Sequence, residues 1–379
     1  MSSTACLHAG ICSSCAGYVQ YSSSFYDDKK NILINETKMR GLDLPPISIS
    51  SIGDYDFRDR VDLIYEDGKL GFFEKEKKVI FDLVSCHQFS PALKEWFFEF
   101  KIWAKKIKIK KGSVRLRVSP EGKKGAWLDF SNHDVAILLT EKELLQELYK
   151  MCSVEVGQRL KKLIIKSDGS LGLSKEREFY PWFETYYGDD LQAFPLYCAI
   201  GSFTQPGIVA NKVLVKHVLE LLKKTPNYPV MELFCGPGNF SFPLASTGRM
   251  IDSYEIDEFS LACFRHTLKK HPTLNEHLHL HELNLYKKSG LPDLKRELVL
   301  FVDPPRSGLK NVLHYLRATA FEKRPHCLIY VSCFAPSLAQ DLLVLTELGY
   351  ELEDVFGIDQ FPQSKHCEWG VLLIKNNMK

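Results

Sequence analysis

The chain has 379 residues, of which 45% are hydrophobic and 25% charged, a composition typical of globular proteins and long enough for two domains. Its formal net charge of +2 excludes overall basicity as a nucleic-acid signal, so any RNA-binding surface has to be local. No apolar run approaches the roughly 18 residues of a membrane helix, and the opening MSSTACLHAG lacks the pattern of a signal peptide. We therefore expect a cytoplasmic protein that does not bind membranes.

The first cysteines of the chain have the spacing of metal ligands. Cys6, Cys12 and Cys15 occur in CLHAGICSSC with the pattern C-x5-C-x2-C, and Cys86 follows in DLVSCHQFSPAL. Four thiolates bind either structural zinc or an iron–sulfur cluster, and the softness of sulfur does not distinguish the two. Zinc sites of this kind generally pair two short C-x2-C units, and only one is present here. Cysteines that bind no metal are the third alternative.

A dense basic run follows at residues 101–118, KIWAKKIKIKKGSVRLRV. Charge runs are most often solvated faces. Contact with nucleic-acid phosphates is the alternative, to which Arg58 and Arg60 in DFRDRVDL would contribute. The segments SVRLRV, GAWLDFS and VAILLT are typical of short strands, and EKELLQELYKMC is typical of a helix. We therefore predict that residues 1–200 form a separate, mostly β region.

From residue 201 onward, helix-like and strand-like segments alternate. NKVLVKHVLELLKK and EFSLACFRHTLKK have helical spacing, whereas YPVMELF, MIDSYEI, ELVLFVD, CLIYVSC and WGVLLIK are apolar strands. This alternation predicts the α/β fold class, with a doubly wound, Rossmann-like domain and a largely parallel sheet over residues 201–379. In such domains ligands bind at the carboxyl ends of the strands.

Two loops at predicted strand ends carry ligand-binding signals. In ELFCGPGNFS, Gly236 and Gly238 would let the backbone approach a ligand. Glu255, about 20 residues later, is placed to hold ribose hydroxyls. In FVDPPRSGL, Asp303 ends a later strand, and two prolines stiffen the loop after it. A tight turn and a solvated aspartate are the alternatives, but repetition at strand ends favours a binding pocket.

Cys333 ends the next strand, in YVSCFAPSLAQDL, and precedes a predicted helix. Free cysteines are most often core residues, but a thiol at a helix N-terminus is expected to have a lowered pKa and to be nucleophilic. Near the C-terminus, DQFPQSKHCEWGVLLIK places Glu368 at the start of an apolar strand. A carboxylate entering a buried sheet has a raised pKa, which suits a general base. A solvated strand end is the alternative.

Five motifs, in this order, resemble those of the S-adenosylmethionine-dependent RNA uracil-5-methyltransferases: SFTQP, ELFCGPGNF, FVDPPRSGL, YVSC and DQFPQSKHCEWGVLL. The resemblance implies a class I methyltransferase domain, S-adenosylmethionine as cofactor and a uridine in RNA as substrate. It implies that Cys333 is the nucleophile that adds to carbon 6 of uracil, and that Glu368 is the base that removes the proton from carbon 5. It also implies cofactor contacts from Gln205, Phe234, Asn239, Glu255 and Asp303.

The resemblance is uneven along the chain. The family usually has asparagine after the nucleophile, where this chain has Phe334. The spacing of Cys6, Cys12 and Cys15 resembles the 4Fe-4S site of members that act on large-subunit ribosomal RNA, with Cys86 as the fourth ligand. SFTQP and the last motif instead resemble the enzymes that modify the T-loop of tRNA. We expect a monomer that acts on 23S rRNA, with tRNA as the alternative substrate.

Two other function classes remain for comparison. Methyltransferases that modify amino groups of adenine or guanine use an Asn/Asp-Pro-Pro-aromatic motif and need no thiol, whereas Asp303 is followed by Pro-Pro-Arg. A non-catalytic RNA-binding or RNA-folding protein would keep the fold and the cofactor loop. Full biological effect of a Cys333→Ala variant would indicate that class.

Overall fold

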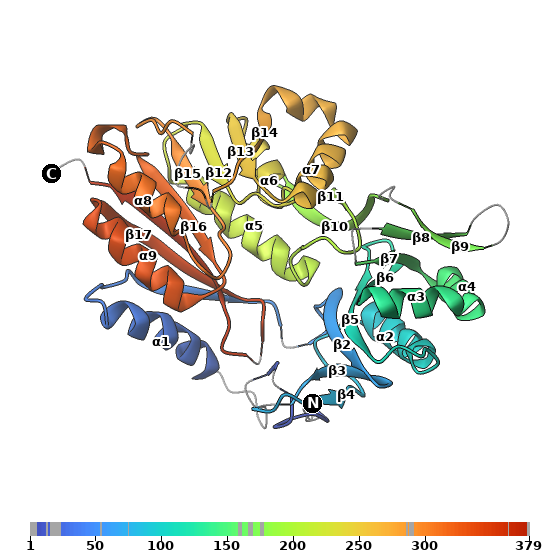
Figure 1. Cartoon of the computed structure of the whole chain (residues 1–379). Coiled ribbons are helices and arrows are strands. Elements are labelled where there is room, and N and C mark those ends of the chain that lie inside the picture. The colour runs from blue at the N-terminus through green and yellow to red at the C-terminus, as the bar shows by residue number, and fades with distance from the viewer. Residues whose placement is uncertain are drawn as a thin grey trace.

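Two eight-stranded sheets and a two-stranded hairpin make up the fold in the computed structural model (Figure 1). The residues that the structure describes are 6–12, 14–15, 24–53, 55–74, 76–157, 161–165, 170–174, 178–285, 287, 292–362 and 364–376. None of the helices within these ranges is long and apolar enough to cross a membrane.

The C-terminal sheet has the strand order β1-β17-β18-β16-β15-β12-β13-β14. Its strands are β1 (Ile47–Ser51), β12 (Val230–Leu233), β13 (Ile251–Glu255), β14 (Leu278–Glu282), β15 (Val299–Val302), β16 (Cys327–Ser332), β17 (Tyr350–Asp359) and β18 (Glu368–Lys375). Strands β12 to β16 pair in parallel, whereas β18 is antiparallel to both of its neighbours, β16 and β17. The predicted α/β fold with a largely parallel sheet is confirmed.

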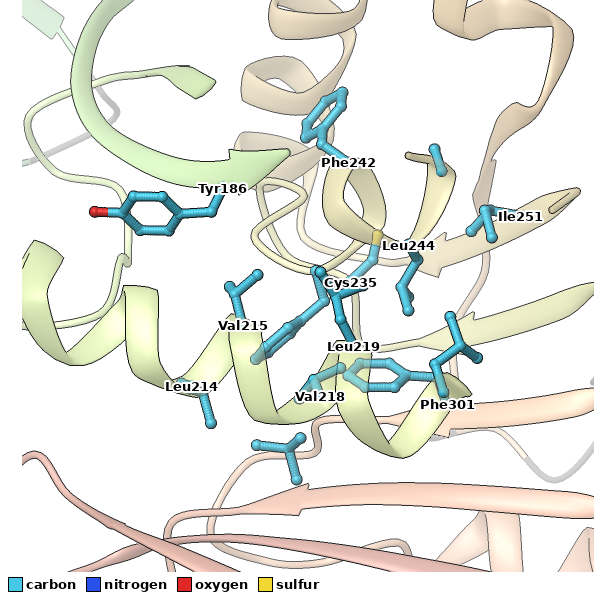
Figure 2. Close-up of a cluster of buried hydrophobic side chains, with 14 of the residues drawn as sticks. Tyr186, Leu214, Val215, Val218, Leu219, Cys235, Phe242, Leu244, Ile251 and Phe301 are labelled. Carbon is cyan, nitrogen blue, oxygen red and sulfur yellow. The ribbon is translucent and has the colours of Figure 1, made fainter. Parts of the chain in front are cut away.

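Helices cover both faces of this sheet because its strands are apolar on both sides. In β16, Ile329 and Val331 pack into a core with α5, while Leu328 and Tyr330 pack into a second core with α9. Successive side chains of a strand point to opposite faces, so a continuous apolar strand needs cover on each. Figure 2 shows the core on the α5 side. On this side lie α5 (Ile208–Lys223), α6 (Ser241–Ala245) and α7 (Glu258–Lys270). On the other side lie α1 (Ser24–Lys38), α8 (Asn311–Ala318) and α9 (Ala335–Glu347). The chain also has two 3-10 helices within the described ranges, η2 (Pro272–Glu276) and η3 (Phe321–Lys323).

The N-terminal sheet has the order β4-β3-β2-β5-β6-β7-β8-β9. The aromatic side chains of Trp96, Phe97 and Phe100 on α2 pack into its core and are 0% exposed. The predicted β-rich N-terminal region is therefore present. Its elements are β2 (Arg60–Glu66), β3 (Lys69–Phe73), β4 (Ile80–Asp82), α2 (Pro91–Ala104), β5 (Lys111–Val118), β6 (Lys124–Phe130), α3 (Asn132–Thr140), α4 (Lys142–Met151), β7 (Ser153–Val156), β8 (Lys161–Ile165) and β9 (Leu171–Ser174), and the hairpin β10 (Tyr180–Tyr187) and β11 (Gln192–Cys198) follows.

Two features differ from the sequence prediction. The segment VAILLT was predicted as a strand but lies in helix α3; Ser131 caps this helix, since its hydroxyl accepts the N–H of Asp134. In addition, β1 joins the C-terminal sheet by pairing in parallel with β17, and Lys29 of α1 forms a buried ion pair with Asp359. Helix α1 and strand β1 therefore belong to the C-terminal sheet and its cover, although the predicted division of the chain at residue 200 stays a prediction.

Candidate active site

The antiparallel insertion of β18 brings Cys333 and Glu368 together. Strands β15 and β16 end at the same edge of the sheet because they are parallel, and β18 begins at that edge because it runs the opposite way. Ser332, the last residue of β16, lies opposite Trp369. The next residues outward are therefore Cys333, directly after β16, and Glu368, the first residue of β18.

The Cys333 thiol lies among charged groups. Burial, and then the negative charges of Glu368 and Asp303, raise its pKa to about 11. Arg306 opposes this shift through its charge and a hydrogen bond to the thiol. The sequence predicted a lowered pKa from the amides of the following helix, and that prediction is wrong for the free protein, because burial and the two carboxylates outweigh Arg306. Phe334 occupies the N-cap of α9 and provides no side-chain cap.

Glu368 is buried, with 5% of its surface exposed. Gln360 Nε2 donates to Glu368 Oε1 at 2.6 Å and to Gln205 Oε1 at 3.1 Å. Burial, followed by the charge of Asp303, raises the pKa of Glu368 well above its ordinary value. Gln360 thus connects the carboxyl group to Gln205, a predicted cofactor contact from the loop before α5.

The predicted cofactor loop has the backbone of a ligand-binding turn. Phe234, directly after β12, has a φ of +66°, a left-handed conformation that costs free energy in a residue other than glycine. Gly236 and Gly238 also have positive φ values, and a Cβ on Gly238 would lie 2.5 Å from the Phe242 ring. The Glu255 carboxylate accepts the N–H of Gly236 at 2.9 Å. Loop and carboxylate are therefore fixed relative to each other.

The two remaining predicted cofactor residues differ in their surroundings. Asn239 and Asn211 exchange two side-chain amide hydrogen bonds, of 2.8 and 2.9 Å, so the Asn239 amide is engaged within the protein. Asp303 is partly buried at the end of β15. Burial, and then the charge of Glu232, raise its pKa to about 7.

Sequence reasoning did not single out Arg306, Gln360 or Asp341. Arg306 and Gln360 lie inside the motifs FVDPPRSGL and DQFP. Their place in these motifs could have identified them as site residues. Asp341 lies on α9, where its Oδ2 accepts the N–H of Leu309 at 2.8 Å and the hydroxyl of Tyr330 at 2.6 Å. Asp341 therefore ties the loop after Asp303 to the strand that ends at Cys333.

The four predicted metal ligands lie together, at a distance from these residues in sequence. Cys6, Cys12, Cys15 and Cys86 line one cavity. Within the described ranges, no group of three or more potential ligands is placed to hold a metal ion. Gln88, which also lines the cavity, donates from Nε2 to the carbonyl oxygen of Pro362 at 2.7 Å. The cavity is thereby joined to the loop that follows β17 and carries Gln360.

Comparison with known proteins supports the arrangement. Residues 194–376 match the sequence profile of a family described as tRNA (Uracil-5-)-methyltransferase. An RNA methyltransferase from Bdellovibrio bacteriovorus, itself uncharacterised, is 36% identical over 329 residues, which is 85% of this chain and 82% of that protein. The chain belongs to the S-adenosylmethionine-dependent RNA uracil-5-methyltransferases.

Two further relatives of this methyltransferase are informative. A 23S rRNA (uracil(1939)-C(5))-methyltransferase from Shewanella sediminis is 27% identical over 86% of this chain and 70% of that protein. The crystal structure of a Pyrococcus abyssi tRNA (uracil-54, C5)-methyltransferase in complex with S-adenosyl-L-homocysteine superposes with a TM-score of 0.65 at 19% identity, covering 92% of this chain and 83% of that one. The second comparison supports the fold of the methyltransferase over nearly its whole length.

The raised pKa of Cys333 predicts how this thiol reacts in the free methyltransferase. Because the thiolate is the reactive form, alkylation by iodoacetamide should be slow at neutral pH and accelerate about tenfold for each pH unit toward pH 10. Arg306→Met, which removes a charge that lowers the pKa, should slow alkylation further. Peptide mass spectrometry gives the rate at Cys333, with buried Cys235 as the unreactive reference. A rate that levels off below pH 8 would contradict the prediction.

The hydrogen bonds of Asp341 predict that its substitution lowers the stability of the methyltransferase. Asp341→Ala leaves the Leu309 N–H and the Tyr330 hydroxyl without their shared acceptor, at a cost of about 1–3 kcal/mol for each buried donor. Asp341→Asn keeps one carbonyl oxygen, and Tyr330→Phe removes only one of the donors, so both should cost less. Urea unfolding measures the three differences. An alanine variant as stable as the unmodified protein would show that the contact does not fix the loop.

Proposed function

We propose that Cys333 and Glu368 are the nucleophile and the base with which this methyltransferase modifies carbon 5 of a uridine in RNA. The observation that carries the proposal is their adjacency at the sheet edge, with Arg306 hydrogen-bonded to the thiol. A thiol and a carboxyl group at one strand end are the two groups that this substitution requires.

The reaction follows from these two side chains. After the Cys333 thiol has lost its proton to solvent, the thiolate adds to carbon 6 of uracil, and the electron pair displaced from the ring double bond makes carbon 5 nucleophilic. S-adenosylmethionine supplies an electrophilic methyl group, which carbon 5 takes. Glu368 then removes the proton from carbon 5, and the electrons of that C–H bond restore the double bond as the Cys333–carbon 6 bond breaks. The products are 5-methyluridine, S-adenosylhomocysteine, the free thiolate and a protonated Glu368.

We propose that Gln205, Phe234, Asn239, Glu255 and Asp303 hold S-adenosylmethionine. The residues present fit this group: the positive φ values at Phe234 and Gly238 open the loop for close approach, and Glu255 is fixed beside it. Asp303 and Glu368 add carboxyl groups at the same edge. A site rich in carboxyl groups suits a sulfonium cation better than an anion.

We further propose that Cys6, Cys12, Cys15 and Cys86 hold a 4Fe-4S cluster. Zinc sites of this kind generally pair two C-x2-C units, and the sequence has only one. A cubane cluster binds each thiolate through a different iron, which suits four thiols spaced around one cavity. Arg58 lines the same cavity and would face the charge of the cluster.

Metal analysis tests the cluster. Protein purified without oxygen should contain about four irons and four sulfides per chain, and Cys86→Ser should reduce both contents. Cys152→Ser, which changes a buried cysteine in the N-terminal core, should keep them. Zinc without sulfide would contradict the assignment.

We propose 23S rRNA as the substrate and the T-loop of tRNA as the alternative. The Shewanella relative is named for 23S rRNA, and the family profile and the Pyrococcus structure are named for tRNA; the cysteine cavity favours the first. We also propose that residues 1–200 bind RNA and the cluster, that residues 201–379 form the methyltransferase domain, and that the protein acts as a cytoplasmic monomer. Mass spectrometry of nucleosides from separated 23S rRNA and tRNA, with and without the gene, tests the substrate. Loss of 5-methyluridine from tRNA alone would reverse the assignment.

A further inference from the structure

Arg60, the first residue of β2, has a buried guanidinium with incomplete hydrogen bonding. Its side chain is 11% exposed, and its ion pair with Asp62 spans 3.6 Å. Nε and Nη1 are buried and have no hydrogen-bond partner among the residues that the structure describes. A guanidinium has five N–H donors, and donors left unpaired away from water cost free energy. An acceptor from outside the chain would therefore stabilise Arg60.

The neighbouring arginines have a different role. Arg115 and Arg117, on the adjacent strand β5, donate from their Nη atoms to backbone carbonyl oxygens of residues 199–202. Glu155 accepts the N–H groups of residues 200 and 201. These three side chains hold the loop that leads to Gln205, whereas Arg60 makes none of those contacts.

The surroundings of Arg60 have an excess of positive charge. Burial, and then the positive charge of Arg115, lower the pKa of Arg60 to about 9, whereas the negative charge of Asp62 raises it. Asp62 also pairs with Arg115, so one half-exposed carboxylate serves two guanidiniums. A further anion at this position would meet two positive charges and a single negative one.

Arg60 also lies beside the segment that leads to the proposed catalytic residues. Its guanidinium carbon is 5.1 Å from the ring centre of Phe203, whose side chain is 62% exposed. Two residues further, Gln205 joins the hydrogen bonds of Gln360 and Glu368. By contrast, Lys106 and Lys111 of the basic run predicted from the sequence pair with Glu147 and Glu66.

We propose that Arg60 binds a backbone phosphate of the substrate RNA beside the modified uridine. The proposal rests on the proposed function, since it takes RNA as the substrate. A phosphate oxygen provides an acceptor of the kind that Nε and Nη1 lack among the described residues, and guanidinium groups bind phosphates through charge-assisted hydrogen bonds. The phosphate would lie beside Phe203, at the segment that leads to Gln205.

The test uses RNA oligonucleotides that the unmodified protein methylates, each carrying one neutral methylphosphonate near the target uridine. At one position, the methylphosphonate should weaken RNA binding by the unmodified protein on the order of tenfold. The same methylphosphonate should have little effect on RNA binding by Arg60→Gln, because the two changes remove the same contact. Arg60→Gln should also reduce the slope of log Kd against log salt by about 0.7–0.9. Arg60→Lys, which keeps the charge but loses the planar fork, should give an intermediate affinity.

Controls separate this proposal from the proposed function. Lys223→Gln removes an exposed charge at the end of α5 and should leave the salt slope unchanged, while thermal unfolding of the Arg60 variants shows that they are folded. Equal methylphosphonate penalties in the unmodified protein and Arg60→Gln, or an unchanged salt slope, would overturn the phosphate site. If the unmodified protein methylates no RNA at all, the proposed function fails instead.

Discussion

Cys333→Ala should reduce methyl transfer by roughly four orders of magnitude or more, the scale seen when an enzyme loses its nucleophile. Without the thiol, nothing adds to carbon 6, and carbon 5 stays a poor nucleophile. In the unmodified protein, RNA with 5-fluorouridine at the target site should trap the covalent adduct, because fluorine at carbon 5 cannot leave as the proton does. Cys333→Ala should form no such complex, because it has no thiol to add to carbon 6. Transfer of labelled methyl groups and denaturing gels measure the two effects.

Cys327→Ala is the matched control for this experiment. Cys327 is buried at the opposite end of the same strand, β16, so its substitution tests the effect of losing a thiol from the strand without touching the pocket. Methyl transfer and the covalent complex should persist in it. Formation of 5-methyluridine by Cys333→Ala at the normal rate would remove Cys333 from the mechanism. A cellular effect that persists while methylation is lost would favour the non-catalytic class.

The sequence predicted five of the eight strands of the C-terminal sheet, β12, β13, β15, β16 and β18, because strands buried on two faces leave apolar runs in the chain; β1, β14 and β17 were not predicted. It also predicted which residues stand at the strand ends, since glycine and proline mark the loops there. Cys333, Asp303 and the loop at Gly236 are found at those ends. These are local properties, written in neighbouring residues.

Contacts between distant segments were beyond such reasoning. The direction of β18, which places Glu368 beside Cys333, depends on pairing with β16 and β17 and has no local signature. The same holds for the insertion of β1 beside β17. The raised pKa of Cys333 follows from burial and from carboxylates that arrive from other strands, so the helix terminus alone gave the wrong direction.

Hydrogen bonds near the cysteine cavity connect segments that are far apart in the sequence. Gln88 lines the cavity and donates to the carbonyl oxygen of Pro362, and Gln360, two residues earlier, donates to Glu368. A short path of hydrogen bonds and backbone therefore links the cavity to the proposed base. The N-terminal region thus contacts the loop after β17 through Gln88, which no motif in either region could indicate.

Glu368→Gln should stop the reaction after methyl transfer. Glutamine cannot take the proton from carbon 5, so the double bond is not restored and the Cys333–carbon 6 bond does not break. We expect methylated RNA to accumulate in covalent complex with the protein, while turnover falls by about 10²–10⁴-fold. Labelled methyl groups that migrate with protein on a denaturing gel would measure the complex. Glu353→Gln, an exposed position on β17, is the control and should form no such complex.

The pH dependence of the unfolding free energy of Glu368→Gln tests the same carboxyl group independently. The folded-state pKa of Glu368 is raised well above the unfolded value, so between these two values the folded state binds more protons than the unfolded one. The contribution of Glu368 to stability must therefore fall as pH rises through this window, whereas glutamine cannot ionise. The difference in unfolding free energy between variant and unmodified protein should shift in favour of the variant from pH 5 to pH 8. If that shift is present but no covalent complex forms, Glu368 is a buried acid that acts before methyl transfer, and the base that takes the carbon 5 proton lies elsewhere in the pocket.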